Sequence, residues 1–316
     1  NWQRKMSADP ADRDDSIAVT RPRPGHADLV GALKYDHADM RNVLERASAR
    51  ETTVRVASGS LAPQILERFG VRVMGYCAEI GGIVARHDDL APDQVFAAAE
   101  QSPVRMADPD AEERVIELVD RCKKDGDTLG GVVEVCVTGL PPGLGSYVHW
   151  DRKVDARVAG ALMSIQACKG VGLGAGFATA RVRGSEIHDE IVRTSQGIGR
   201  ASNNYGGTEG GMTTGEPLRV RAAFKPISTL MKPLRSVDIK TGEESKATIE
   251  RSDVMAVPAA AVICEAVVAF ELAGLEPGEH DVMVFHRDYV SNVVGPIALE
   301  SGEIREGVEV VLSDGG

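Results

Sequence analysis

Residues 217–229 read PLRVRAAFKPIST, a stretch in which apolar and cationic side chains alternate. Alternation with a period of two is typical of a β-strand that has one face against a core and the other toward polar surroundings. The apolar members are Leu218, Val220, Ala222 and Phe224, and the cationic members are Arg219, Arg221 and Lys225. We therefore predict an amphipathic strand that ends at a proline turn.

Two amphipathic helices are predicted before this strand, the first over residues 109–124. Asp108 can cap its first turn, Pro109 suits its first position, and two lysines followed by Gly126 suit its end. The second helix is indicated by apolar residues that recur at helical spacing, namely Val154, Val158, Leu162 and Ile165. We expect it to end at Gly170, which opens the glycine-rich run GVGLGAGF.

Other patterns complete the outline of the fold. Further helices are predicted at residues 27–35, 50–70 and 257–274, and further strands at 71–83 and 130–140. The helix at 257–274 is apolar nearly all round, which is typical of a buried helix. Amphipathic helices together with an alternating strand agree with the α+β class.

The composition is that of a globular protein with an acidic balance. The 316 residues, 43% hydrophobic and 26% charged, suit one large domain or two ordinary ones. A formal net charge of −11 argues against nucleic acid as the main partner, so any anionic ligand must meet locally concentrated positive charge. No apolar run is long enough to span a bilayer, and the polar first residues argue against a secretory signal. The five cysteines form no CxxC pair, which argues against a zinc site and favours a cytoplasmic protein.

Four stretches combine glycine with polar or cationic side chains. They are RPRPGHAD (21–28), LERASARET (44–52), NNYGGTEGGMTTG (203–215) with the later KPIST (225–229), and ERSDV (250–254). The lysine and hydroxyl groups of KPIST suit a phosphate, but a strand end followed by a proline turn explains them equally well at this point. The run GVGLGAGF lacks the third glycine of a dinucleotide loop, since that position is Ala175. His87 and His188 lie beside carboxylates in the sequence, and we predict that both are surface residues.

Seven motifs stand in a fixed order along the chain. They are RPRPGHADL (21–29), VLERASARET (43–52), GDTLGGVVE (126–134), ALMSIQACKGV (161–171), NNYGGTEGGMTTGEP (203–217), AAFKPISTL (222–230) and ERSDVMAVPAA (250–260). In this order and at these separations they resemble the chorismate synthase family, over residues 1 to about 274. The resemblance implies one α+β domain there, a β-α-β sandwich with antiparallel sheets inside and helices outside, assembled as a homotetramer. For residues 275–316 we expect short strands and turns.

The resemblance also implies a reaction. Members of the family convert 5-enolpyruvylshikimate 3-phosphate to chorismate, a step of the shikimate pathway toward aromatic amino acids, by a 1,4-anti elimination of phosphate. They use reduced FMN although the reaction has no net redox change. An electron passes transiently from the flavin to the substrate as phosphate leaves, and flavin N5 then takes up the proton or hydrogen atom from the substrate ring. Two sources of reduced flavin fit, a separate NADPH-dependent reductase or a reductase activity of the chain itself.

Carried over residue by residue, the resemblance implies two catalytic residues and a set of flavin contacts. His26 corresponds to an active-site acid, and Asp253 corresponds to the residue that helps to deprotonate flavin N5. The flavin contacts correspond to Arg46, Ala47, Ser48, Gln166, Ala167, Gly210, Lys225, Pro226, Ile227, Ser228, Thr229 and Arg251. A reduced flavin tends toward an anion, so the arginine and lysine side chains of this set suit it. The expected site is a cationic pocket in an acidic protein.

The chain departs from the family pattern at several points. It opens with Asn1 and Trp2, where family members have already passed a segment with a GESHG motif, a second catalytic histidine and substrate-binding arginines. We therefore expect little or no turnover by this chain alone, because each uncompensated substrate charge costs on the order of 2 kcal/mol. Ala175 stands where the family has an acid, and Tyr205 where it has a small residue. The alternative to the enzyme is a flavin- or anion-binding protein of the same fold without catalysis.

Overall fold

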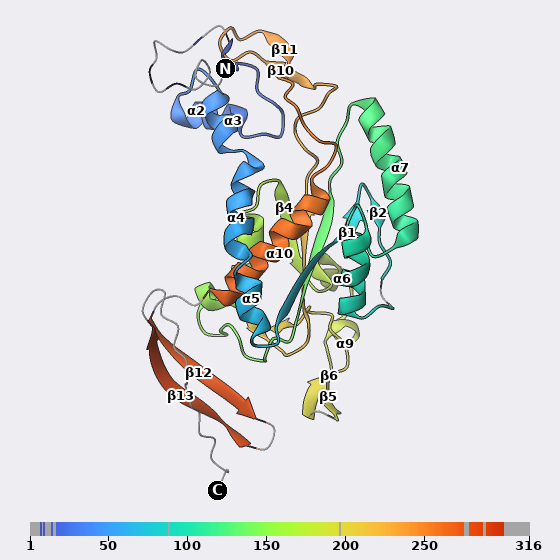
Figure 1. Ribbon diagram of the computed structural model, residues 1–316, viewed down its shortest axis with the longest axis vertical. Helices are drawn as coiled ribbons and strands as arrows, with labels where there is room; N and C mark the ends of the chain where they lie inside the picture. The colour runs from blue at the N-terminus through green and yellow to red at the C-terminus, as the bar shows by residue number, and fades with distance from the viewer. Residues whose placement is uncertain are drawn as a thin grey trace. The chain divides into compact units, whose positions relative to one another are not determined.

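The computed structural model of the protein describes residues 7, 9, 14, 17–87, 89–195, 197–274, 278–286 and 289–299. The chain divides into two compact units, residues 1–273 and 274–316. Every residue predicted for the site belongs to the first unit, in which helices pack against a central sheet (Figure 1).

Five antiparallel strands form the sheet of the first unit. Their spatial order is β2-β1-β3-β9-β4, and their bounds are β1 Arg72–Ile80, β2 Ile83–Val84, β3 Gly131–Thr138, β4 Cys168–Leu173 and β9 Leu218–Phe224. Strand β9 confirms the alternating strand predicted from the sequence, and it pairs with β3 on one side and with β4 on the other. Strands β1 and β3 confirm the strands predicted at 71–83 and 130–140.

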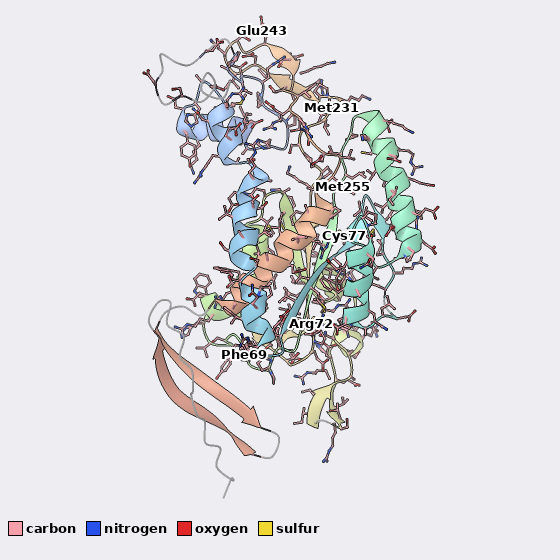
Figure 2. The ribbon with its side chains drawn as sticks, viewed as in Figure 1. Phe69, Arg72, Cys77, Met231, Glu243 and Met255 are labelled. Carbon is pink, nitrogen blue, oxygen red and sulfur yellow. The ribbon has the colours of Figure 1, made fainter. Side chains whose placement is uncertain are left out.

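One face of the sheet packs against a buried helix, α10 (Val257–Ala273), which confirms the apolar helix predicted there. The two elements meet most closely at Gly75 of β1. A Cβ added to Gly75 would lie 2.5 Å from the carbonyl oxygen of Ala261 in α10, so only glycine fits at this crossing. Cys77, two residues further along β1, is fully buried in the same apolar core (Figure 2).

The opposite face of the sheet holds a buried carboxylate. Glu134 of β3 is 1% exposed and accepts hydrogen bonds from the Tyr76 hydroxyl (2.6 Å), Arg219 Nε (2.8 Å) and Arg221 Nε (2.6 Å). Burial alone would raise the pKa of the Glu134 carboxyl, but the two arginines outweigh burial and lower it. The cationic face predicted for β9 is therefore partly neutralised by its neighbouring strand.

Helices cover both faces of this sheet. Their bounds are α2 Asp28–Tyr35, α3 Arg41–Arg46, α4 Thr52–Gly59, α5 Ala62–Glu67, α6 Pro92–Gln101, α7 Pro109–Asp125, α8 Val154–Met163 and α9 Gly184–Ile187. Of these, α2, α3 and α9 lie beyond the sheet (Figure 1). Residues of α5 and α8 share the core of α10, whereas α6 packs against Met74 and Tyr76 on the other face of β1. This arrangement of helices and antiparallel strands confirms the α+β class.

The structure confirms the predicted ends of one helix but not the predicted end of another. Helix α7 has the predicted caps, because Asp108 accepts a hydrogen bond from the Ala111 amide (3.1 Å) and Gly126 adopts φ +70°. The predicted end of the second helix at Gly170 was wrong, because α8 ends at Met163 and Gly170 lies inside β4. A turn with φ +69° at Ala167 starts this strand, whose apolar side chains then pack against the core.

Short elements complete the first unit. Among the described residues they include the 3-10 turns η3 Ala49–Glu51, η4 Trp150–Arg152 and η5 Gly176–Arg181. They also include the two-stranded pairs β5 Ile191–Thr194 with β6 Gly197–Arg200, β7 Thr208–Glu209 with β8 Met212–Thr213, and β10 Arg235–Val237 with β11 Glu244–Lys246. In the second unit, β12 (Gly278–His286) pairs antiparallel with β13 (Tyr289–Leu299). The remainder of the tail predicted to form short strands and turns lies outside the described residues.

The two histidines predicted to lie at the surface differ in their exposure to solvent. His188 is exposed, which confirms its prediction. His87 is only 7% exposed, so its prediction was wrong. Its ring meets the ring of Tyr76 edge-on, with 5.3 Å between the centroids, and this aromatic contact explains its burial.

The contact at Gly75 gives a test of the packing. In Gly75→Ala the new methyl group must displace α10, and we expect the free energy of unfolding to fall by about 1–3 kcal/mol. The matched control is Gly160→Ala in α8, where an added Cβ meets nothing within 4 Å. This control should gain about 0.5–1 kcal/mol, because alanine favours a helix over glycine. Urea denaturation measures both, and equal stability of the two variants would contradict the packing.

Candidate functional site

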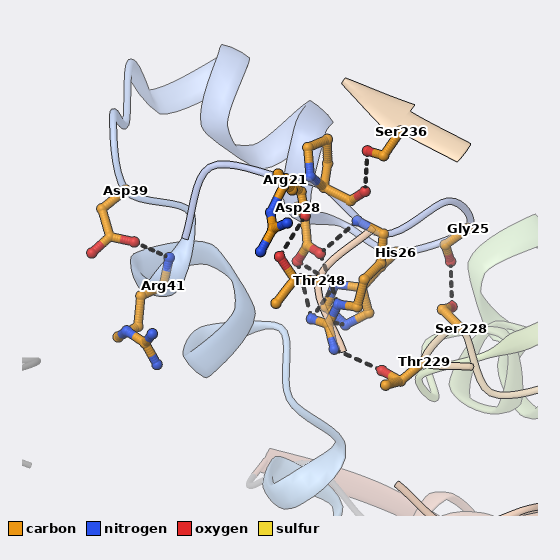
Figure 3. A network of polar contacts seen from close by, with 12 residues as sticks. Arg21, Gly25, His26, Asp28, Asp39, Arg41, Ser228, Thr229, Ser236 and Thr248 are labelled. Carbon is orange, nitrogen blue, oxygen red and sulfur yellow. Dashed lines mark hydrogen bonds and ion pairs between the residues drawn. The ribbon is translucent and has the colours of Figure 1, made fainter. Parts of the chain in front are cut away.

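Two loops that are far apart in the sequence are joined in the structure. Arg23 Nη1 donates a hydrogen bond to Thr229 Oγ1 (2.8 Å), and Ser228 Oγ donates to the Gly25 carbonyl (2.8 Å) (Figure 3). Gly25 adopts φ +75°, a conformation that favours glycine. We call residues 21–28 and 225–229 together the joined loops. They contain His26 and the whole KPIST motif, so the structure brings together two of the predicted groups of site residues.

The first joined loop is fastened along its length by residues that follow KPIST. Ser236 Oγ donates to the Pro22 carbonyl (2.5 Å), and Thr248 Oγ1 donates to the Arg21 carbonyl (2.9 Å). Thr20 just before it donates to Asp238 (2.6 Å). These bonds fix the path of the loop that carries His26 against the strand pair β10 and β11.

His26 lies in a compact charged cluster. Its Nδ1 donates to Asp28 Oδ1 (2.6 Å), and Arg23 Nε donates to Asp28 Oδ2 (2.8 Å). The side chain of Asp28 is 1% exposed, whereas that of His26 is 22% exposed. Burial alone would raise the pKa of Asp28, but hydrogen bonds from His26 and Arg23 outweigh burial and hold it well below its usual range. Asp28 is therefore a carboxylate that only accepts hydrogen bonds.

The second joined loop begins with Lys225, which follows directly on β9. Its Nζ donates to Ser228 Oγ (2.6 Å), and its amide donates to the Ala167 carbonyl (3.0 Å). Burial lowers the pKa of Lys225, and the cations Lys169 and Arg23 lower it further. Three cations thus gather here, and positive charge that repels itself in the free protein favours a bound anion.

The residues predicted on the other side of this loop form a connected group. Gln166 Nε2 donates to Glu51 Oε2 (2.8 Å), and its Oε1 is buried without a hydrogen-bond partner among the described residues. Ser48 begins the 3-10 turn η3 that leads to Glu51, and its hydroxyl accepts a hydrogen bond from the Arg50 amide (3.3 Å). Arg46 and Ala47 precede it at the end of α3, and Arg46 is exposed.

A polar cleft of about 370 Å³ adjoins the joined loops. Thr229 and Asp253 both line it, together with Lys123 and Asp127 at the end of α7. Two methionines that also line it, Met231 and Met255, lie in the region between α7 and α10 (Figure 2). Asp253 and Arg251 are exposed. The cleft thus connects the predicted acidic residue Asp253 to the loop that carries Thr229.

Gly210 does not join this group. It lies at the tip of the β7–β8 pair and adopts φ +62°. The neighbouring Gly211 carbonyl accepts from the amide of Val154 at the start of α8, whereas Gln166 follows the end of the same helix. A helix of ten residues spans about 15 Å, so Gly210 lies near the far end of α8 from the joined loops.

The two departures from the family pattern are neighbours in the structure. The Ala175 amide donates to the Asn204 carbonyl (2.8 Å), directly before Tyr205. The Tyr205 hydroxyl is hydrogen-bonded to His188 Nδ1 (2.6 Å). Both therefore lie beside the start of β9, at the end of the strand away from Lys225.

Several residues of the site had no predicted role. Asp28 and Arg23 contact His26, Glu51 holds Gln166, and the Thr128 hydroxyl donates to the Ile227 carbonyl (2.7 Å). A signal existed for Asp28, because a carboxylate two residues after a histidine within a proline-rich turn can reach the imidazole. Nothing in the sequence pairs Thr128 or Glu51 with its partner.

The described residues contain neither a cluster of metal ligands nor a helix that could span a membrane. In this part of the chain, no three histidine, cysteine, aspartate or glutamate side chains converge as metal ligands would. No helix there is both long enough and apolar enough to cross a membrane.

Comparisons with known proteins agree on one family. A family model described as chorismate synthase matches residues 1–275. Curated relatives include chorismate synthase of Pelobacter propionicus, 57% identical over 300 residues that cover 92% of this chain and 76% of the relative. Chorismate synthase of Symbiobacterium thermophilum is 61% identical over 280 residues, which cover 86% and 72% of the two chains. A crystal structure of chorismate synthase superposes with a TM-score of 0.65 and 41% identity, covering 78% of this chain and 69% of the other.

The contact between the joined loops can be tested through Thr229. Thr229→Val keeps the shape of the side chain but leaves a nitrogen–hydrogen group of Arg23 without its acceptor, so the free energy of unfolding should fall by about 1–3 kcal/mol. Thr241→Val, in an exposed turn, is the matched control and should change stability by less than about 0.5 kcal/mol. Chemical denaturation of both variants provides the measurement. The contact would be refuted by a Thr229 variant as stable as its control.

Proposed function

This chain belongs to the chorismate synthase family, and on that premise we propose that the joined loops and the adjoining polar cleft form its active site. The chain is a carbon–oxygen lyase that forms chorismate from 5-enolpyruvylshikimate 3-phosphate. Identities of 57–61% over most of the chain favour this enzyme over a non-catalytic protein of the same fold. The contact of Arg23 and Gly25 with the KPIST loop carries the proposal, because it unites the predicted acid with the predicted flavin loop.

The substrate is strongly anionic, since it carries one phosphate and two carboxylates. In a protein of net charge −11 such a substrate needs a local excess of cations. Lys225, Lys169 and Arg23 supply one. Burial lowers the pKa of Lys225 most, and repulsion from the other two cations lowers it further. We propose that this cluster attracts the substrate phosphate and that Arg251, exposed near the cleft, adds a further cation.

The residues of this region also fit reduced FMN. Gln166 offers a buried oxygen that receives no hydrogen bond from the residues that the structure describes, and a flavin ring nitrogen–hydrogen group can supply one. Lys225, Ser228 and Thr229 offer a cation and two hydroxyls to anionic or oxygen-bearing parts of the cofactor. When bound, reduced FMN would supply the transient electron that a redox-neutral elimination of phosphate uses.

Two side chains are proposed to move protons. His26 is partly exposed and held by Asp28 through Nδ1, so its other ring nitrogen, Nε2, which lies 3.5 Å from Arg23 Nη2, can donate a proton beside the site. Asp253 is exposed at the cleft, where its carboxyl group can exchange a proton with a bound ligand. Thr229 links the surroundings of the two groups, because it bonds Arg23 and also lines the cleft with Asp253.

The proposal extends to the assembly and the setting of the enzyme. Gly210 lies near the far end of α8, so its predicted flavin contact would come from a second copy, and we propose a homotetramer as the source. Reduced flavin would come from an NADPH-dependent reductase or from the chain itself. We also retain residues 1–274 as the catalytic domain, residues 275–316 as a separate tail, and a cytoplasmic location where the phosphorylated substrate is made.

Lys225 offers a direct test of the proposed flavin site. Lys225→Ala should raise the Kd for FMN about 10- to 100-fold, because a hydrogen bond to a charged group contributes about 1.5–3 kcal/mol. Lys240→Ala, an exposed lysine in the turn between β10 and β11, is the control and should bind like the unaltered chain. Flavin fluorescence gives the Kd, with and without 5-enolpyruvylshikimate 3-phosphate, and the substrate should tighten binding. Equal Kd values for both variants would place the flavin elsewhere.

A further inference from the structure

We propose that Asp28 is a positioning residue, whose buried carboxylate keeps a proton on Nδ1 of His26 so that Nε2 is the nitrogen that gives up and takes up a proton. The inference rests on the proposed function only in giving His26 the role of an acid. The arrangement of Asp28 and His26 itself stands on geometry alone.

The environment of Asp28 leaves it no role except that of acceptor. Its oxygens receive the Arg23 amide (3.1 Å), Arg23 Nε (2.8 Å), Arg23 Nη2 (3.1 Å) and His26 Nδ1 (2.6 Å). Four donors saturate the lone pairs of one carboxylate, and the side chain is 1% exposed. Because an ionised carboxylate offers no hydrogen, the short contact to Nδ1 requires that this nitrogen carry the hydrogen in both charge states of the ring.

Asp28 is itself held still. It is the first residue of α2, and the two nitrogens of the Arg23 side chain that grip it come from a guanidinium that is also fixed to Thr229. The position of the imidazole is therefore set relative to the KPIST loop through a continuous chain of hydrogen bonds. An acid that must reach a bound ligand gains from such fixed placement.

The charges around the ring explain why a carboxylate is needed. Arg23 Nη2 lies 3.2 Å from His26 Nδ1, and a guanidinium at this distance opposes a positive imidazole. Lys225 lies close enough to Arg23 for the two cations to repel each other. The Asp28 carboxylate is bonded to both Arg23 and His26, so its negative charge offsets this repulsion beside the ring.

A purely structural role predicts something different. If Asp28 served only to clamp Arg23 and the loop, its replacement would lower stability but would leave the tautomer of His26 unchanged. The distinguishing readout is therefore the protonation of His26 itself, which does not depend on catalytic turnover.

Nitrogen-15 NMR of the histidine rings in the full 316-residue chain measures this directly. In the unaltered chain, neutral His26 should carry its hydrogen on Nδ1. In Asp28→Asn the ring-nitrogen signals of neutral His26 should move away from this single tautomer, because an amide group can donate a hydrogen bond to Nδ1 as well as accept one from it. The matched control is Asp39→Asn, a carboxylate that accepts the Val19 and Arg41 amides (2.9 Å each) in the same part of the unit. This control should leave the His26 signals unchanged.

The outcomes separate the inference from the proposed function. A neutral His26 with its hydrogen on Nε2 in the unaltered chain would overturn the inference even if Asp28→Asn fails to fold. An unchanged tautomer in a folded Asp28→Asn variant would overturn it as well. Addition of FMN and 5-enolpyruvylshikimate 3-phosphate to the unaltered chain tests the proposed function. If the His26 signals follow Asp28 as expected but do not respond to these ligands, the positioning role is supported and the proposed site is refuted.

Discussion

The pairing of β9 with both β3 and β4 is the constraint on which the site depends. Phe224 at the end of β9 pairs with Gly131 of β3 and with Cys168 of β4. The residues just beyond these partners must therefore meet, and they do: Lys225 bonds Ala167, and Ile227 bonds Thr128. Because side chains alternate along a strand, a slip of one residue would turn the apolar face of β9 outward and separate these loops. The core packing of the sheet thus fixes the position of the KPIST loop in the proposed site.

The first joined loop, residues 21–28, contacts the KPIST loop from a distant part of the sequence. It brings Arg23 and His26 against KPIST, and buried Asp28 compensates part of the added positive charge. The result is a small cationic region in a protein whose net charge is −11. We propose that this region binds the anionic substrate: the cations are held near one another before the substrate arrives, so little reorganisation is required.

The sequence predicted the local elements well because their signals are local. The alternation along 217–225 and the caps of α7 depend on neighbouring residues, and both predictions were confirmed. The end of α8 was mispredicted because the chain turns at Ala167, a non-glycine residue with positive φ, and not at a glycine. The strand that follows this turn pairs with β9, and the sequence gives no local signal of that pairing. The resemblance assigned His26 and KPIST to one site, but their contact through Arg23 and Gly25 depends on tertiary packing, which no spacing in the sequence reveals.

Hydrogen exchange of the amides, followed by mass spectrometry with and without FMN and 5-enolpyruvylshikimate 3-phosphate, tests the central claim most directly. If the joined loops form the site, peptides that cover residues 21–28 and 225–229 should gain protection together when both ligands are present, because the ligands bridge the two loops. Peptides of the apolar groove lined by Val54 and Phe270, on the side of α4 and α10, should not change. Protection confined to that groove, with both loops unaffected, would contradict the account.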